Sequence, residues 1–201
     1  MARPPAIEAD TAFRVSLNLE SVGLTDDQFN RLCSDNRHSR IELTADKQLI
    51  IMSPCRPETS RQNVKIVQRL ANWADEDSTG VCFGPDAIFS LPNGAKRSPD
   101  ASWIPKRRWD RLTAEEKLTI TPICPDFVIE LRSLSDRVSD LEEKMEEYIS
   151  NGAKLGWLLD TIDNRAVIYH PGNPPLTIET PEMISGDPVL KEFHFNFREI
   201  L

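Results

Sequence analysis

The sequence Pro125-Asp126-Phe127-Val128-Ile129-Glu130-Leu131-Arg132 decides the fold, because it reads as a short strand that carries a glutamate where a buried strand is expected to be apolar. Side chains alternate along a strand, so Phe127, Ile129 and Leu131 point to one face. Asp126, Glu130 and Arg132 share the opposite face with Val128. Such a strand either exposes its charged face to water or lines a polar site. An upstream Pro-Asp pair, Pro99-Asp100, and an acidic helix directly downstream favour the polar site.

The segments around this strand alternate between helical and strand-like patterns. The helical ones run from Thr25 through Cys33, over residues 58–75 with Thr59 or Ser60 as cap, and over residues 135–151. Strand patterns cover a hairpin at 40–53, residues 81–91 and 95–104 joined by Pro92-Asn93-Gly94, and residues 155–160, 166–170, 176–179 and 192–201. This order predicts an α/β fold with a mixed central β-sheet flanked by helices and an additional N-terminal β-hairpin. We expect residues 1–24 to form a leader and first strand, and residues 25–201 to form a single domain.

The composition limits the classes of function. The 201 residues carry a net charge of −8, which argues against a general nucleic-acid coat protein. No apolar run is long enough to cross a membrane, and residues 1–10 lack the apolar core of a secretory signal. The four scattered cysteines form no CxxC pair, so we expect reduced thiols in a cytoplasmic protein and no zinc site.

One segment departs from the acidic balance. Residues 96–111 contain six basic side chains and two aspartates, which makes them a basic island in an acidic body. Such an island suits a localised anionic partner, although a solvated loop would have the same composition. Within it, Arg97 and Arg108 are the side chains that we expect to contact phosphates, whereas Trp103 and Trp109 are expected to pack.

Carboxylates on two strands suit a hard cation. Mg²⁺ takes oxygen ligands, usually one or two carboxylates together with waters and substrate phosphate. Asp100 ends one strand and Glu130 lies in a strand that could neighbour it, so both are candidate ligands. Asp126 lies roughly 13 Å from Glu130 at the rise of a strand, and we expect it to serve the start of the strand instead. Glu58 is a candidate third acid, or simply a first-turn glutamate favoured by the helix dipole.

Lys144 is the lone lysine beside the apolar stripe of the acidic helix. At about 100° per residue it falls roughly 40° outside that stripe, at the edge of the buried face. From there it could reach back over the preceding strand. The spacing alone favours the alternatives, in which Lys144 pairs with Asp140 or lays its stem along the edge of the core.

Several motifs, in this order, resemble the bacterial Uma-type "putative restriction endonuclease" family of the PD-(D/E)xK nuclease superfamily. They are Pro99-Asp100, the stretch from Pro125 to Leu131, Glu143-Lys144-Met145 with Tyr148, Asn151-Gly152, and Gly156-Trp157-Leu158-Leu159-Asp160. The resemblance implies a restriction-endonuclease-like core with Asp100 and Glu130 as metal carboxylates and Lys144 as the functional lysine. Glu58 matches the acid that the superfamily often has on its first helix. Arg132 stands where the superfamily's basic motif has its lysine, and arginine is a poor base because it stays protonated.

The expected function is therefore a Mg²⁺-dependent endonuclease, with Mn²⁺ as an alternative cation, that hydrolyses phosphodiester bonds of DNA. Arg132 is expected to contact phosphates, and the family resemblance implies a homodimer. The alternative is a catalytically weak or inactive nuclease-fold module that binds nucleic acid or a protein partner. A third reading, a structural protein with solvated charges, predicts that Asp100, Glu130 and Lys144 lie far apart.

Overall fold

A six-stranded mixed sheet forms the centre of the molecule in the computed structural model, which describes residues 14–52 and 54–201. Its strands, in spatial order, are β11 (Leu176–Glu179), β10 (Arg165–Tyr169), β9 (Leu155–Asp160), β8 (Phe127–Leu131), β7 (Ala101–Pro105) and β4 (Gly80–Phe83). Only β8 and β9 pair in parallel among these neighbours, and the chain between them forms helix α5 (Val138–Ser150). A parallel pair needs such a crossover, so the predicted mixed sheet is confirmed.

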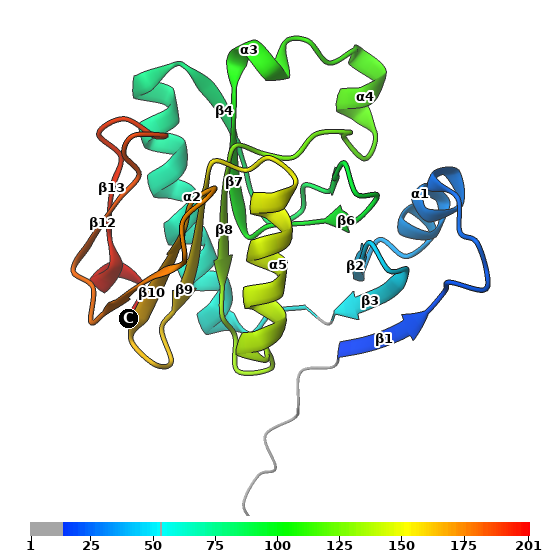
Figure 1. Cartoon of the computed structure of the whole chain (residues 1–201), viewed down its shortest axis with the longest axis horizontal. Helices are drawn as coiled ribbons and strands as arrows, with labels where there is room; N and C mark the ends of the chain where they lie inside the picture. Colours follow the sequence, from blue (N-terminus) through cyan, green and yellow to red (C-terminus); the bar gives the residue numbers. More distant parts are fainter. Residues whose placement is uncertain (1–13, 53) are drawn as a thin grey trace, which may run out of the picture.

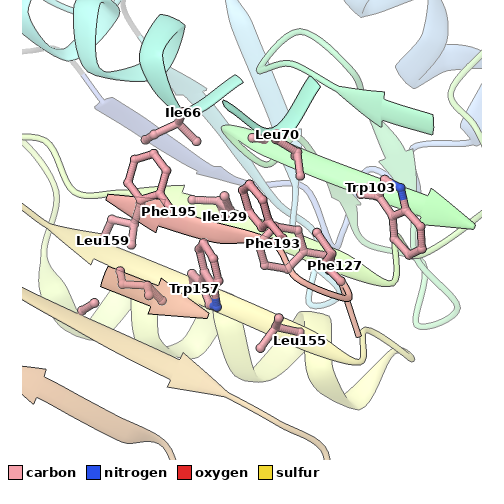
Figure 2. Close-up of a cluster of buried hydrophobic side chains, with 14 of the residues drawn as sticks. Ile66, Leu70, Trp103, Phe127, Ile129, Leu155, Trp157, Leu159, Phe193 and Phe195 are labelled. Atoms are coloured by element: carbon pink, nitrogen blue, oxygen red, sulfur yellow. The ribbon is translucent and has the colours of Figure 1, made fainter. Parts of the chain in front are cut away.

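The decisive strand β8 is buried along its whole length. Phe127 and Ile129 lie in the core between the sheet and helix α2 (Pro57–Asp77), where they join Trp157 and Phe193 (Figure 2). Val128 faces the opposite way and packs in the core beneath α5. Figure 1 shows α5 in front of the sheet and α2 behind it, so both faces of β8 are covered. Its charged face consequently lines an interior site and not the solvent.

A second sheet of five strands stands beside the first (Figure 1). It contains β1 (Arg14–Asn18), β3 (Gln48–Met52), β2 (Arg40–Leu43), β6 (Lys96–Arg97) and β5 (Phe89–Ser90), in that order. The predicted hairpin is present as the antiparallel pair β2–β3, with residue 53 outside the described residues. Thus the N-terminal hairpin joins a strand pair that comes from the middle of the chain.

The strands predicted at 81–91 and 95–104 are wrong in extent. Each is divided between the two sheets, as β4 and β5 and as β6 and β7. Gly84-Pro85 interrupts the first segment and Ser98-Pro99 the second, because proline cannot donate a ladder hydrogen bond. The turn between them is as expected: β5 and β6 form an antiparallel pair, and Gly94 adopts a positive φ of 88°.

The helices match their predicted positions more closely than their predicted ends. Helix α1 (Asp26–Asp35) begins with the expected capping box of Thr25 and Gln28. Helix α2 begins at Pro57 behind Arg56, so the predicted caps Thr59 and Ser60 are wrong. Proline at the first helical position already has the φ angle that a helix requires, which starts the helix earlier than the polar residues indicate.

Short elements complete the chain: α3 (Lys106–Trp109), α4 (Ala114–Leu118), β12 (Met183–Ser185), β13 (His194–Asn196) and the 3-10 helix η1 (Phe197–Ile200). The four cysteines are free in the structure. Within the described ranges, no helix has both the length and the apolar character needed to span a membrane. The expected leader at residues 1–10 lies outside the described residues, and the division of the chain at residue 25 stays a prediction.

Candidate active site

The two predicted carboxylates, Asp100 and Glu130, lie directly beside each other. Strands β7 and β8 pair Ala101 with Ile129, and the two carboxylates come from the residues next to this pair, Asp100 before Ala101 and Glu130 after Ile129. The Asp100 backbone N–H donates to the Ile129 carbonyl at 3.0 Å, and the Leu131 N–H donates to Oδ2 of Asp100 at 2.9 Å. Paired strand ends therefore hold both carboxylates at one edge of the central sheet.

Lys144 extends from α5 over β8, which is one of the positions that the sequence predicted for it. Its Nζ lies 2.8 Å from Oε1 of Glu130. Tyr148, one helical turn further along α5, donates its hydroxyl to the same oxygen at 3.1 Å. Asp100, Glu130 and Lys144 are 6%, 3% and 8% exposed, so the reading in which these charges are solvated and far apart is wrong.

Glu42 is a member of this group that the sequence reasoning missed. It lies on β2 in the second sheet, is 2% exposed, and accepts from Nζ of Lys144 at 2.9 Å. The Ser98 N–H donates to the same Glu42 oxygen at 3.0 Å, and Nη1 of Arg97 lies 3.2 Å from the other. The sequence offers little sign of this role, because Glu42 between Ile41 and Leu43 looks like an outward-facing residue of an amphipathic hairpin.

The same hairpin strand brings a cation to Asp100. Nη1 of Arg40 lies 2.9 Å from Oδ1 of Asp100, and Arg40 also donates to the Ser98 carbonyl. Burial opposes the charged form of Arg40, but the carboxylates of Asp100, Glu42 and Glu130 raise its pKa above the usual arginine value. Both metal-ligand candidates thus have a cationic partner from another element.

The pKa values of the two buried glutamates, Glu130 and Glu42, are shifted in opposite directions. Burial raises the pKa of Glu130 to about 7; Lys144 opposes that rise, and the carboxylates of Asp100 and Glu42 add to it. Burial would also raise the pKa of Glu42, but Lys144, Arg97 and Arg40 together lower it to about 2. Glu42 is therefore ionised at neutral pH, whereas burial is the main reason that the pKa of Glu130 is about 7.

These side chains line a cleft of about 1320 Å³. The hairpin β2–β3 supplies one wall, the start of α2 another, and Asp100, Glu130 and Lys144 lie where β8 meets α5. A cleft of this size, with convergent charged groups and a carboxyl whose pKa is strongly shifted, is the common signature of a binding or catalytic site.

Arg132 also lines the cleft, but its guanidinium is held by two acids. Its Nη1 lies 2.7 Å from Asp160 and 2.6 Å from Asp163. Burial opposes its charged form, while hydrogen bonds to these two carboxylates raise its pKa. A phosphate contact through Arg132 would have to share or replace these partners.

The basic island does not form one surface. Arg97 is buried and clamped between Glu42 and Glu147, and Lys96 is buried against Asp26 and Ser90. Arg108 pairs with Asp126 at the start of β8 and is not among the residues that line the cleft. Arg97 lines the cleft, although its guanidinium is held by Glu42 and Glu147, whereas Arg108 lies at the other end of β8. Their expected phosphate contacts stay predictions.

Asp126 lies at the start of β8 and Glu58 lies in the first turn of α2, the positions that the non-catalytic alternatives predicted for them. Burial raises the pKa of Asp126, and its partner Arg108 opposes this rise at the start of the strand, as expected. Glu58 lines the cleft but is exposed and pairs with Arg61 on its own helix at 2.6 Å. Within the described ranges, no three His, Cys, Asp or Glu side chains are grouped as a metal site, so Glu58 is not assembled with Asp100 and Glu130.

The comparisons with known proteins point to one family. The Uma2 family model, described as "Putative restriction endonuclease", matches residues 26–198. A crystal structure of a "putative nuclease belonging to DUF820" from Anabaena variabilis ATCC 29413 is 20% identical; the match covers 88% of this chain and 97% of that chain, with a TM-score of 0.71. This likeness shows that the two proteins share a fold.

A cryoEM structure of a DrdV–DNA complex is 15% identical over 56% of this chain and 9% of that chain. Its TM-score of 0.35 is too low to support an inference. No curated protein matches the chain. Since the family model spans most of the sequence and the shared fold agrees with it, this chain belongs to the Uma2 family of restriction-endonuclease-like proteins.

Proposed function

We propose that this protein is a Mg²⁺-dependent nuclease that hydrolyses phosphodiester bonds of DNA, with Mn²⁺ able to replace Mg²⁺. One observation carries the proposal: Asp100 and Glu130, next to the paired residues Ala101 and Ile129 of adjacent strands, line one cleft, with the ammonium of Lys144 2.8 Å from Glu130. The family description supports the same reaction class.

The side chains fit a hard divalent cation. Mg²⁺ is usually bound through one or two carboxylates together with water and substrate phosphate, and Asp100 and Glu130 would be those carboxylates. Burial raises the pKa of Glu130 and the carboxylates of Asp100 and Glu42 add to this rise, so a bound cation would favour the ionised form of Glu130. When bound, the cation would polarise the phosphoryl group and lower the pKa of a coordinated water.

The chain's own residues supply the remaining functions. Lys144 has three N–H donors; Glu42 accepts one, and Glu130 is its ion-pair partner at 2.8 Å, so a further N–H can hold the attacking water or a phosphate oxygen. Tyr148 fixes the orientation of Glu130 through its hydroxyl. Arg132, at the margin of the cleft, would stabilise charge on the phosphate as a fixed cation, not as a base.

Cleavage of supercoiled plasmid and of single-stranded DNA in Mg²⁺ or Mn²⁺ tests the proposal. We expect nicking by the wild-type protein and a loss of at least about 100-fold in Asp100→Asn and Glu130→Gln, because each variant removes a carboxylate charge without changing side-chain shape. Glu146→Gln, an exposed acid on α5, is the matched control and should cut normally. Equal rates in all four proteins, or no cutting by the wild type, would refute the proposal.

A second candidate is a nuclease-fold module that binds without cutting. It is favoured by the ion pairs already made by the site, because Arg40 and Lys144 neutralise both ligand candidates and Arg132 is held by two aspartates. A Mg²⁺ titration separates the two candidates. The nuclease requires binding that depends on Asp100 and Glu130, whereas the binding module does not. A homodimer and a cytoplasmic location, both expected from the sequence, stay predictions.

A further inference from the structure

Glu42 is a deeply buried charged residue at the site, and it comes from outside the central sheet. It lies on β2, which pairs with β3 and β6 in the five-stranded sheet, whereas Asp100 and Glu130 belong to the six-stranded one. Its side chain spans the space between the two sheets and ends on Lys144 of α5. A buried carboxylate in such a place is costly unless it is fully paired, which indicates a specific role.

Hydrogen bonds from three groups hold the carboxylate of Glu42. One oxygen accepts from Nζ of Lys144 and from the Ser98 N–H, and the other faces Arg97. Arg97 in turn pairs with Glu147, one turn beyond Lys144 on α5. The hairpin and the helix are therefore joined by a closed ionic connection, in which Glu42 is aimed at the Lys144 ammonium.

Lys144 has two carboxylate partners, but only Glu130 is a candidate metal ligand. Nζ lies 2.8 Å from Oε1 of Glu130 and 2.9 Å from Oε1 of Glu42. A cation bound at Glu130 would repel the ammonium and compete with it for the same oxygens. Glu42 offers the ammonium a carboxylate that the metal does not need.

We infer that Glu42 is a positioning residue, which holds Lys144 in the site independently of Glu130 and leaves Glu130 available to a divalent cation. This inference rests on the proposed metal-dependent nuclease function. Without Glu42, the ammonium has Glu130 as its only carboxylate partner among the described contacts, so it would compete more strongly with the metal. Glu42 would act through Lys144 and touch neither metal nor substrate.

Mn²⁺ binding to the full-length protein, measured by isothermal titration, tests the inference with a double-mutant cycle. We expect Glu42→Gln to weaken Mn²⁺ binding about tenfold in the wild-type background and by less than about twofold in the Lys144→Met background, because the effect passes through Lys144. Glu143→Gln, an exposed acid that lines the same cleft, should weaken binding by less than about twofold and controls for charge alone. An equal loss on Glu42→Gln in both backgrounds would overturn the inference.

Acetylation of lysines by acetic anhydride, followed by mass spectrometry, gives a readout that needs no metal. Lys144 should stay protected in Glu130→Gln, because Glu42 still holds it, and should react at least about fivefold faster in Glu42→Gln. Lys96 is buried in the neighbouring strand β6, so unchanged protection of Lys96 excludes general opening of the hairpin. Faster acetylation of Lys96 and Lys144 together in Glu42→Gln, or of Lys144 in Glu130→Gln alone, would overturn the inference.

The Mn²⁺ titration and the acetylation experiment distinguish a failure of the proposed metal-dependent function from a failure of the positioning role of Glu42. If the wild type binds no Mn²⁺ yet Lys144 is released by Glu42→Gln alone, the metal-dependent function fails and the positioning of Lys144 by Glu42 stands. If Mn²⁺ binds through Asp100 and Glu130 and both tests of Glu42 are negative, the function stands and the positioning role fails.

Discussion

At the scale of single residues, the site is a buried ionic network with more acid than base. Four carboxylates, those of Glu42, Asp100, Glu130 and Glu147, meet three cations, those of Arg40, Arg97 and Lys144. Burial disfavours the ionised form of a carboxyl group, and neighbouring carboxylates add to this effect. Both act on Glu130, whose pKa is raised to about 7 although Lys144 opposes the rise.

The first prediction concerns the pH dependence of stability without metal. An unfolded glutamate titrates near pH 4.3, so between about pH 4.3 and 7 folded Glu130 keeps a proton that the unfolded chain has released. Its stabilising contribution is complete below this window and is lost as the pH rises through it. In EDTA, the free energy of unfolding of the wild type should therefore fall by about 2–3 kcal/mol relative to Glu130→Gln between pH 4.5 and 7.5.

Urea denaturation of both proteins across that pH range checks this result. Glu42 has a lowered pKa, so its own contribution is present at neutral pH and is lost only below the window, as the pH falls toward 2. Parallel stability profiles for the wild type and Glu130→Gln would contradict the shifted titration of Glu130.

The sequence predicts some residues of the site better than others, for a physical reason. Asp100, Glu130 and Lys144 can be selected because strand alternation, helical spacing and the family motifs each apply within a short segment. Glu42 and Arg97 owe their roles to contacts across 55 positions of the chain, which no local pattern contains. The composition of the basic island does not show that Arg97 is buried, because a buried arginine counts toward it in the same way as an exposed one.

At the scale of elements, the packing of a few strands and helices sets the geometry of the site. Strand β8 could be recognised from its alternation, and its apolar face lies against α2 as that pattern implies. The segments at 81–91 and 95–104 could not be assigned correctly from strand propensity, since Gly84-Pro85 and Ser98-Pro99 transfer the chain from one sheet to the other. The second of these transfers leaves Asp100 directly before β7, next to the Ala101–Ile129 pair that Glu130 follows.

The pairing of β4 with β7 gives a prediction at this scale. A Cβ atom at Gly80 would lie 2.2 Å from Cε2 of Trp103 and 2.5 Å from the Ile104 carbonyl oxygen. The backbone and a buried ring cannot both move easily, so Gly80→Ala should lower the free energy of unfolding by about 2–3 kcal/mol. Urea denaturation measures this loss.

Gly84→Ala is the matched control for that change. Its added Cβ would meet Val67 at 3.8 Å, an ordinary van der Waals contact, so a loss of less than about 1 kcal/mol is expected. Equal losses in the two variants would contradict the packing described between β4 and β7.

At the scale of the whole molecule, two sheets build one site. The six-stranded sheet supplies Asp100 and Glu130, and the five-stranded sheet supplies Arg40 and Glu42 from a single hairpin strand. The α/β class and the flanking helices were predictable from the order of the elements. The joining of β2 to β6 was not, because it unites segments more than 50 positions apart through the pairing of Leu43 with Lys96.

The central claim is that Asp100 and Glu130 together hold the divalent cation of a nuclease. Anomalous diffraction at the manganese absorption edge, from crystals soaked in Mn²⁺, tests it most directly. The account predicts a peak within about 2.0–2.2 Å of one carboxylate oxygen from each residue, and its loss in Glu130→Gln. The absence of a peak between these residues in the wild type, with Arg40 and Lys144 still paired to them, would contradict the claim.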